Sequence, residues 1–216
     1  MTQPTPSYLS DRTPGTGALP PRSWLHSDAT RLDLTGEWAF RLLPSAEPAG
    51  EAADAFAQPD ADVASWARIP VPASWVLLEN GRWGSPIYTN VQFPFPVDPP
   101  RVPDENPTGD YRRVVDVPAE LATDARLVLR FDGVESTYRV WWNGTEVGIG
   151  KGSRLAHEFD VTDLARAGEN VLAVRVHQWS DASYLEDQDQ WWLPGIFRDV
   201  SLTLSLIHIS EPTRPY

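Results

Sequence analysis

The sequence predicts an all-β fold, and more narrowly an antiparallel jelly-roll β-sandwich. Short segments in which apolar and polar residues alternate recur from residue 34 to residue 204, and turns rich in Gly, Pro, Asn and Asp separate them. The chain has no strand–helix–strand alternation and no internal repeat, which disfavours a doubly wound sheet or a complete (β/α)8 barrel. Its 216 residues suffice for one large hydrophobic core.

The N-terminal half holds the less regular segments. Residues 1–22 are rich in Pro, Thr, Ser and Gly, so we expect a flexible arm or an extended strap over a neighbour, followed by the sandwich domain over 23–204. Residues 34–43 predict the first strand, and residues 44–62 a short surface helix or a loop. Two prolines within 68–76 make that segment extended, because a helix interior does not tolerate proline.

The C-terminal half holds the clearest strand patterns. The proline-rich stretch 94–107 predicts a long loop, and Asn143-Gly144 predicts a tight hairpin because both residues tolerate positive φ. Thr162 is expected to cap a single helical turn that Gly168 closes. We expect strands at 111–117, 127–131, 138–142, 147–149, 172–176 and 197–204.

The last twelve residues, SLIHISEPTRPY (205–216), bear no relation to what precedes them. They can be a last strand with a frayed end. We favour a tail foreign to the domain, because the peptide resembles the translated synthetic adapter found at the ends of unrelated reading frames.

The composition excludes several classes of partner. A net charge of −12 disfavours nucleic acid and anionic membranes, because both repel an acidic surface. The chain has no cysteine, which excludes disulfides and thiolate metal sites. The start has no basic head followed by an apolar run, and no stretch approaches the ~18 apolar residues of a membrane span, so we expect a cytoplasmic protein.

The usual catalytic signatures are missing, and the polar chemistry is concentrated in two segments. Residues 179–192 combine four carboxylates with three tryptophans, a composition suited to holding a sugar or a hard cation. The alternative is a solvated acidic loop with packed tryptophans. The carboxylates are Asp181, Glu186, Asp187 and Asp189, and the tryptophans are Trp179, Trp191 and Trp192.

These carboxylates do not suggest a hydrolytic pair. A retaining glycosidase needs two carboxyl groups about 5–5.5 Å apart across the scissile bond, whereas the adjacent Glu186 and Asp187 would point in different directions on an extended loop. The second polar segment is 85–100, where Asn90 offers both a donor and an acceptor for reading a hydroxyl group. The alternative for Asn90 is a capping or turn amide.

Eight segments over residues 22–204 carry a resemblance to a known family. They are LTGEW (34–38), SPIYTNV (85–91), ENPTGDY (105–111), FDGVEST (131–137), WNGTEVGIGKGSR (142–154), EFDVTDLARAGENVLAV (158–174), WSDASYLEDQDQWW (179–192) and GIFRDVSL (195–202). Together they are similar to glycoside hydrolase family 2, and IYTNV with YLEDQD is similar to its long bacterial β-galactosidases. The resemblance implies a sugar-binding jelly-roll domain that packs on a catalytic barrel.

The resemblance also implies site residues and cations. The asparagine matching Asn90 contacts the galactosyl group, and the aspartate matching Asp189 binds galactose and helps to ligate a Na⁺ ion. The aspartate matching Asp181 belongs to a Mg²⁺ site that also uses residues near the N-terminus. Lys151 stands where that site uses a neutral glutamine, and a cation beside Mg²⁺ is unfavourable, which counts against that site in this chain.

The resemblance finally implies the activity of the whole enzyme. It would hydrolyse terminal β-galactosides with retention through two glutamates of the barrel, as part of carbohydrate metabolism and as a homo-oligomer. The sequence ends before such a barrel, so we expect the 216-residue chain to be inactive alone. The alternatives are a free-standing carbohydrate-binding module, a domain that complements a barrel-containing partner chain, and a relative of the β-glucuronidases or β-mannosidases.

Overall fold

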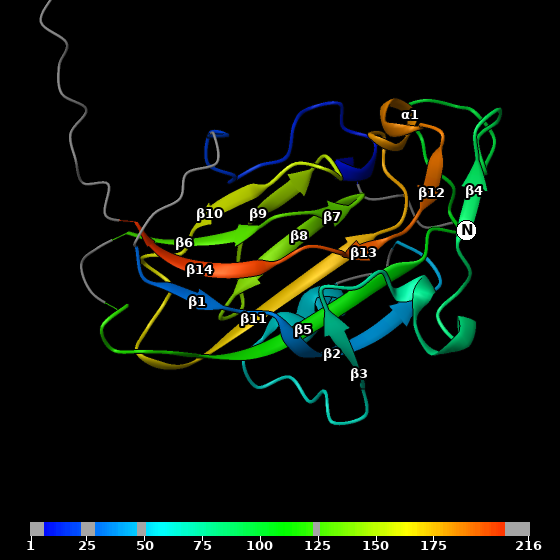
Figure 1. Cartoon of the computed structure of the whole chain (residues 1–216). Coiled ribbons are helices and arrows are strands. Elements are labelled where there is room, and N and C mark those ends of the chain that lie inside the picture. Colours follow the sequence, from blue (N-terminus) through cyan, green and yellow to red (C-terminus); the bar gives the residue numbers. More distant parts are fainter. Residues whose placement is uncertain (1–6, 23–28, 47–50, 123–125, 206–216) are drawn as a thin grey trace, which may run out of the picture.

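The structure, a computed structural model, describes residues 7–22, 29–46, 51–122 and 126–205, without the side chains of residues 51 and 52. Two antiparallel sheets lie face to face (Figure 1), and the predicted fold class is confirmed. The strands are β1 Arg31–Asp33, β2 Gly36–Leu43, β3 Ala67–Val71, β4 Ile87–Thr89, β5 Thr108–Val117, β6 Arg126–Phe131, β7 Val134–Glu135, β8 Thr137–Trp142, β9 Thr145–Lys151, β10 His157–Asp160, β11 Gly168–His177, β12 Gln190–Trp192, β13 Gly195–Ile196 and β14 Val200–Ser205.

The larger sheet has six strands in the order β3-β2-β5-β11-β8-β9, and the smaller has four in the order β1-β14-β6-β10. The remaining named strands pair as two short ribbons, β12-β4 and β13-β7. The helices are short: the 3-10 turns η1 Ser7–Leu9, η2 Glu51–Ala57, η3 Trp75–Leu77 and η4 Glu79–Gly81, and one α-helical turn α1 Ser183–Glu186.

The main core lies between the two sheets. Alternate residues of β8, namely Tyr138, Val140 and Trp142, are fully buried in it, as the sequence pattern predicts. They meet inward residues of the smaller sheet such as Leu129 and Phe131 on β6. Burying apolar side chains at about 25 cal/mol per Å² is the main force that holds the two layers together.

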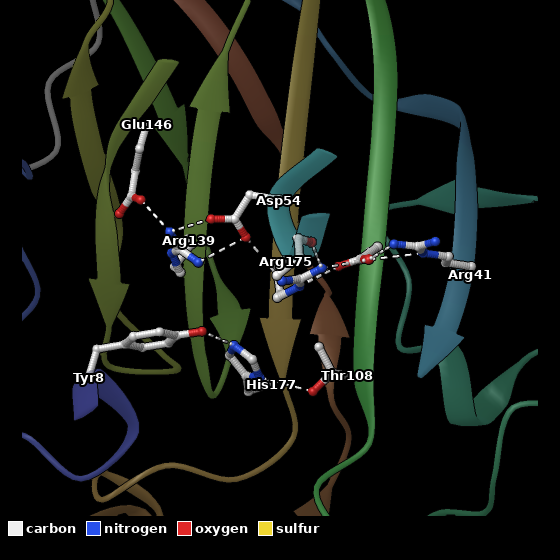
Figure 2. Close-up of polar contacts among 10 residues, drawn as sticks. Tyr8, Arg41, Asp54, Thr108, Arg139, Glu146, Arg175 and His177 are labelled. Atoms are coloured by element: carbon white, nitrogen blue, oxygen red, sulfur yellow. Dashed lines mark hydrogen bonds and ion pairs between the residues drawn. The ribbon is translucent and has the colours of Figure 1, made fainter. Parts of the chain in front are cut away.

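The outer face of β11 is also buried, which the alternating sequence pattern did not predict. Arg175 and His177 lie on that face, and their exposed fractions are only 2% and 0%. The covering elements are η2 and η1, which carry Asp54 and Tyr8 over the sheet (Figure 2). Arg175 donates to Asp54, and Tyr8 forms a hydrogen bond with His177, so polar contacts replace solvent on this face.

The turn predictions have mixed outcomes. The Asn143-Gly144 hairpin joins β8 to β9, and the φ angles of these residues are +51° and +83°, as expected for that turn. The expected helical turn after Thr162 is only a hydrogen-bonded turn. The Thr162 hydroxyl does not cap it, because that oxygen accepts a hydrogen bond from the Leu127 amide and donates to Asp160.

Residues 7–22 form a strap along the edge of the sandwich (Figure 1, blue). Thr16 and Ala18 make isolated bridges to Ile149 on β9 and Phe159 on β10. Arg22 forms an ion pair of 2.7 Å with Glu158, so the strap lies over strands of its own domain. Gly15 allows this close approach, because a Cβ there would lie 1.8 Å from the Ile149 carbonyl oxygen.

The remaining boundaries differ in detail from the expected ones. Of the predicted extended segment 68–76, only the first part pairs as β3, and its end turns into η3. Strand β14 ends at Ser205, one residue beyond the predicted end of the domain. The rest of the predicted tail, 206–216, lies outside the described residues. Among the described residues, no helix is long and apolar enough to cross a membrane.

Candidate functional site

The ribbon β12-β4 brings the two polar segments of the sequence together. In its antiparallel register Gln190 lies opposite Thr89, Trp191 opposite Tyr88, and Trp192 opposite Ile87. Asp189 precedes Gln190 and Asn90 follows Thr89, so these two candidates leave the ribbon at the same end. Figure 1 shows this ribbon at one end of the sandwich beside α1. The roles of Asn90 and Asp189 in binding stay predictions.

One face of the ribbon carries exposed aromatic rings. Tyr88 and Trp191 are 48% and 52% exposed, and their ring centroids lie 5.3 Å apart. The Tyr88 hydroxyl donates a hydrogen bond to Asp189 Oδ1, and this bond raises the pKa of Tyr88 because it holds the proton on the phenol. Asp189 and Asn90 are both exposed, and Asp189 contacts Tyr88 of this aromatic pair.

Buried aromatic rings support the ribbon from below. Trp192 is buried, and its indole N–H donates to the Thr89 hydroxyl at 2.8 Å, which ties the two strands through their side chains. Its ring packs edge-on against Trp179 at 5.1 Å, and Trp179 packs on Phe95 from the proline-rich loop. Leu9 of the strap completes this small core. The sequence places three tryptophans here but does not separate the exposed Trp191 from the two buried ones.

The four carboxylates of the acidic segment have separate surroundings. Glu186 accepts hydrogen bonds from the Ser153 amide at 2.7 Å and the Ser153 hydroxyl at 2.5 Å, which fixes the end of α1 to the loop after β9. Asp187 Oδ1 is shielded from solvent and has no hydrogen-bond partner within the described part of the chain. Only Asp189 lies on the exposed ribbon, so the sequence cluster is not one cluster in space. Ser153, which holds Glu186, lies within the family segment 142–154, but nothing in that segment indicates this contact.

Asp181, the candidate Mg²⁺ ligand, faces an ammonium group. Lys151 Nζ lies 2.7 Å from Asp181 Oδ1 as an ion pair outside hydrogen-bond geometry, and it donates a hydrogen bond to the carbonyl oxygen of Asp11 in the strap. Both charged side chains are largely buried, with 9% and 11% exposed. These residues do not fit a Mg²⁺ ion, because a positive group already lies against the carboxylate that would hold it.

The fold and the site define a class of domain: an antiparallel β-sandwich with carboxylate, amide and aromatic groups exposed on a ribbon at one end. The chain belongs to the glycosyl hydrolases family 2, whose sugar binding domain matches residues 32–205. This match confirms the family expected from the sequence motifs.

The chain is also similar to curated β-galactosidases. It is 60% identical to the β-galactosidase of Arthrobacter sp. (strain B7), a match that covers 91% of this chain and 20% of that protein. It is 48% identical to the enzyme of Vibrio vulnificus (strain YJ016) and 43% identical to that of Kluyveromyces lactis, each over 85% of this chain. The chain therefore spans about a fifth of the length of these relatives.

Solved structures share the fold at lower identity. A Bifidobacterium dentium β-glucuronidase bound to coumarin-3-O-glucuronide matches with a TM-score of 0.58 and 23% identity, over 85% of this chain and 31% of that one. A Faecalibacterium prausnitzii β-glucuronidase matches with a TM-score of 0.57 and 23% identity, over 85% and 33%. At this identity the likeness shows the sandwich fold alone.

Proposed function

We propose that this domain serves a β-galactosidase and that Asn90 and Asp189 hold the galactosyl group at the edge of its active site. The β12-β4 ribbon carries the proposal, because it sends both residues to the same end beside two exposed rings. A carboxylate accepts hydrogen bonds from sugar hydroxyls, an amide both donates and accepts, and aromatic faces cover C–H surfaces. These groups are suited to hold one hexose ring.

Sequence identity to known enzymes favours galactosides over other sugars as the substrate. Identity to β-galactosidases is 43–60% over most of this chain, whereas the β-glucuronidase structures are 23% identical. The 43–60% identity to β-galactosidases supports assigning their substrate class, galactosides, to this domain. A homo-oligomeric whole enzyme is a further part of this proposal. A cytoplasmic location belongs to it too, since a chain without cysteine has no disulfide of the kind common in secreted proteins.

Asp189 is also the proposed ligand of a Na⁺ ion. Its carboxylate is exposed, and one of its oxygens accepts the Tyr88 hydroxyl while the other remains available for a hard cation. Within the described residues no group of three or more His, Asp or Glu side chains could hold a metal. The other ligands of this ion would therefore come from backbone carbonyls, water, the sugar or a further domain.

Bond cleavage is assigned to a catalytic domain outside this chain, through two glutamates and with retention. In the described segment Glu186 is held by Ser153 and Asp189 by Tyr88, so neither is a free acid facing a nucleophile. The domain thus contributes positioning groups to a reaction whose bond-making groups lie elsewhere.

The experiment joins residues 7–205 to the Arthrobacter relative in place of the part that they match. The chimera should hydrolyse a chromogenic β-galactoside, and the 216-residue chain alone should not. Asn90→Ala and Asp189→Asn should each lower the kcat/KM of the chimera by about 10- to 100-fold, the effect of losing a hydrogen bond to a charged or buried polar partner. Replacing Na⁺ by choline should lower the kcat/KM of the chimera but not that of its Asp189→Asn variant.

The matched control is Asp116→Asn, which removes one exposed carboxylate at the far end of β5. It should leave kcat/KM unchanged. If Asn90→Ala and Asp189→Asn also leave kcat/KM of a folded, active chimera unchanged, the proposed sugar contacts are wrong.

A further inference from the structure

We infer that Lys151 supplies a built-in cation in place of Mg²⁺, so that its ammonium group joins the strap to the site loop without a metal. Three segments meet at the Lys151 ammonium: the end of β9 with Lys151, the strap with Asp11, and the site loop, residues 181–189, which begins at Asp181. The inference does not depend on the identity of the sugar, because it concerns how the loop is held.

The contacts around the Lys151 ammonium join the strap to the site loop. Lys151 Nζ lies 2.7 Å from Asp181 Oδ1 and donates to the Asp11 carbonyl oxygen. The Asp181 amide in turn donates to the Leu9 carbonyl oxygen at 2.8 Å. Strap and loop are thus joined twice, once by backbone and once through the lysine. A carboxylate and a carbonyl oxygen around one positive centre are also what a small divalent cation would use.

Burial makes the charge balance decisive. The side chains of Lys151 and Asp181 are 9% and 11% exposed, so their attraction is little screened by water. The ammonium balances the charge of the largely buried Asp181 carboxylate, and it also attracts the exposed Asp11 carboxylate. A divalent ion at the same place would add two positive charges beside the ammonium, which its contacts with Asp181 and with the Asp11 carbonyl oxygen hold there.

Strand pairing fixes the backbone position of Lys151. Lys151 is the last residue of β9 and pairs with Thr137, and its carbonyl oxygen accepts a hydrogen bond from His157 Nε2 at 2.9 Å. It is also the single lysine among 216 residues. Its backbone is therefore fixed on both sides, and the side chain reaches the strap and the loop from a rigid support.

The Lys151–Asp181 contact affects the candidate site because Asp181 and Asp189 lie on one continuous segment. Asp181 begins the segment that continues through α1 to Asp189. Leu9 of the strap packs in the same small core as Trp179 and Trp192. A permanent ammonium at Asp181 would keep this segment in place whatever the divalent ion concentration.

The test measures metal binding and stability in the 216-residue chain. Mn²⁺ serves as the probe, since loss of its free EPR signal reports binding, and thermal midpoints are compared in EDTA and in Mg²⁺. Wild type and Asp181→Asn should bind Mn²⁺ equally. Mg²⁺ should shift the thermal midpoints of these two chains by the same amount. Lys151→Gln should bind Mn²⁺ at least about tenfold more tightly than wild type, and Mg²⁺ should raise its midpoint.

Arg22→Gln is the matched control, because it removes the other strap ion pair, with Glu158, and leaves Asp181 untouched. It should bind Mn²⁺ as wild type does. Wild-type Mn²⁺ or Mg²⁺ binding that Asp181→Asn abolishes would overturn the inference. So would a folded Lys151→Gln chain that gains no affinity. If Lys151→Gln is unfolded in EDTA, Mg²⁺ must restore its near-UV spectrum, and failure to do so counts against the inference.

Discussion

At the scale of single residues, the hydrogen bonds of His177 define its protonation state. Thr108 donates its one hydroxyl proton to the Asn106 carbonyl at 2.9 Å, so His177 Nδ1 must carry the proton in its 2.9 Å contact with Thr108. Nε2 is then the acceptor for the Tyr8 hydroxyl at 2.6 Å. A second proton on Nε2 would face that hydroxyl and the nearby guanidinium groups of Arg139 and Arg175 (Figure 2).

The pH dependence of stability follows from this neutral ring. Burial, and then the charges of Arg175 and Arg139, lower the pKa of His177 well below its ordinary value of 6.5. Unfolded chains therefore bind a proton that folded chains do not as the pH falls below about 6.5. The free energy of unfolding from urea titrations should be lower at about pH 5.5 than at about pH 8.

The variant His177→Gln isolates this contribution. It should be less stable than wild type at high pH, because a buried hydrogen-bond pair is disturbed, but its stability should fall less between the two pH values. His157→Gln is the comparison. Burial lowers the pKa of His157 too, and this variant leaves the hydrogen bonds of His177 intact. Equal falls for wild type and His177→Gln would show that His177 is not the titrating group.

The sequence singled out Asn90, Asp189 and Asp181 as candidates from motif and composition, but it could not indicate which residues contact them. Tyr88 contacts Asp189 across 101 positions, and Ser153 contacts Glu186 across 33. Such contacts depend on strand register, which no local pattern in a single sequence fixes. Lys151 is the exception: its charge at a position expected to be neutral indicated an altered cation site before any geometry was known.

At the scale of elements, the docking of η2 depends on a buried charge network. Asp110 on β5 is fully buried and accepts hydrogen bonds from Arg175 at 2.7 Å and from Arg41 at 2.9 Å. Arg175 and Arg139 reach on to Asp54 of η2 (Figure 2). The guanidinium groups also lie over aromatic rings, as Arg175 does over Phe56 at 4.7 Å. The charges act here together with a small apolar cluster, in which Phe56 and Ala57 of η2 pack against Trp141 and Ala173 of the sheet.

Removing Asp110 should therefore be costly. Asp110→Ala leaves two guanidinium groups without their buried carboxylate, and the free energy of unfolding should fall by about 3–5 kcal/mol in urea titrations. Arg82→Ala breaks an exposed pair of 2.7 Å with Glu79, and its cost should stay below about 1 kcal/mol. Equal losses in the two variants would mean that burial does not set the strength of these pairs.

The strap is held by close backbone packing at Gly15. Because a Cβ there would meet the Ile149 carbonyl oxygen at 1.8 Å, Gly15→Ala should lift the strap from β9. The Ile149 amide, which donates to Thr16 O at 2.8 Å, should then exchange its hydrogen at least about tenfold faster. Arg12→Ala changes an exposed side chain of the same strap and should leave this exchange rate unchanged. If Gly15→Ala leaves it unchanged as well, the strap is not held there.

Elements of the fold differ in how far the sequence predicted them. Long strands such as β5, β8 and β11 were predictable because their inward residues alternate and one core covers that face. The turn after Asp160 and the 3-10 turn of η3 were not, because single side-chain hydrogen bonds and chain reversals decide them. The burial of the outer face of β11 also escaped prediction, since Arg175 and His177 have the polarity of exposed residues.

At the scale of the whole molecule, the sandwich and the site ribbon rest on separate hydrophobic cores of unequal size. The main core joins both large sheets, whereas the site ribbon β12-β4 rests on the small core of Leu9, Ala46, Val102, Trp179 and Trp192. A two-stranded ribbon is marginally stable without such support. We therefore expect the site end to open locally at a lower free energy than the sandwich unfolds, with β12 amides exchanging faster than those of β11.

Trp192→Phe tests this division of the molecule. The change removes the indole donor to Thr89 and part of the packing on Trp179, so it should speed hydrogen exchange within β4 and β12. The slowest amides of β11 should keep their rates, because their exchange reports unfolding of the main core, which lacks Trp192. In the chimera the same variant should raise KM more than it lowers kcat, since it loosens Asp189 without touching the catalytic glutamates. Equal acceleration of exchange in β11 and β12 would instead show one cooperative core, with the site end no less stable than the rest.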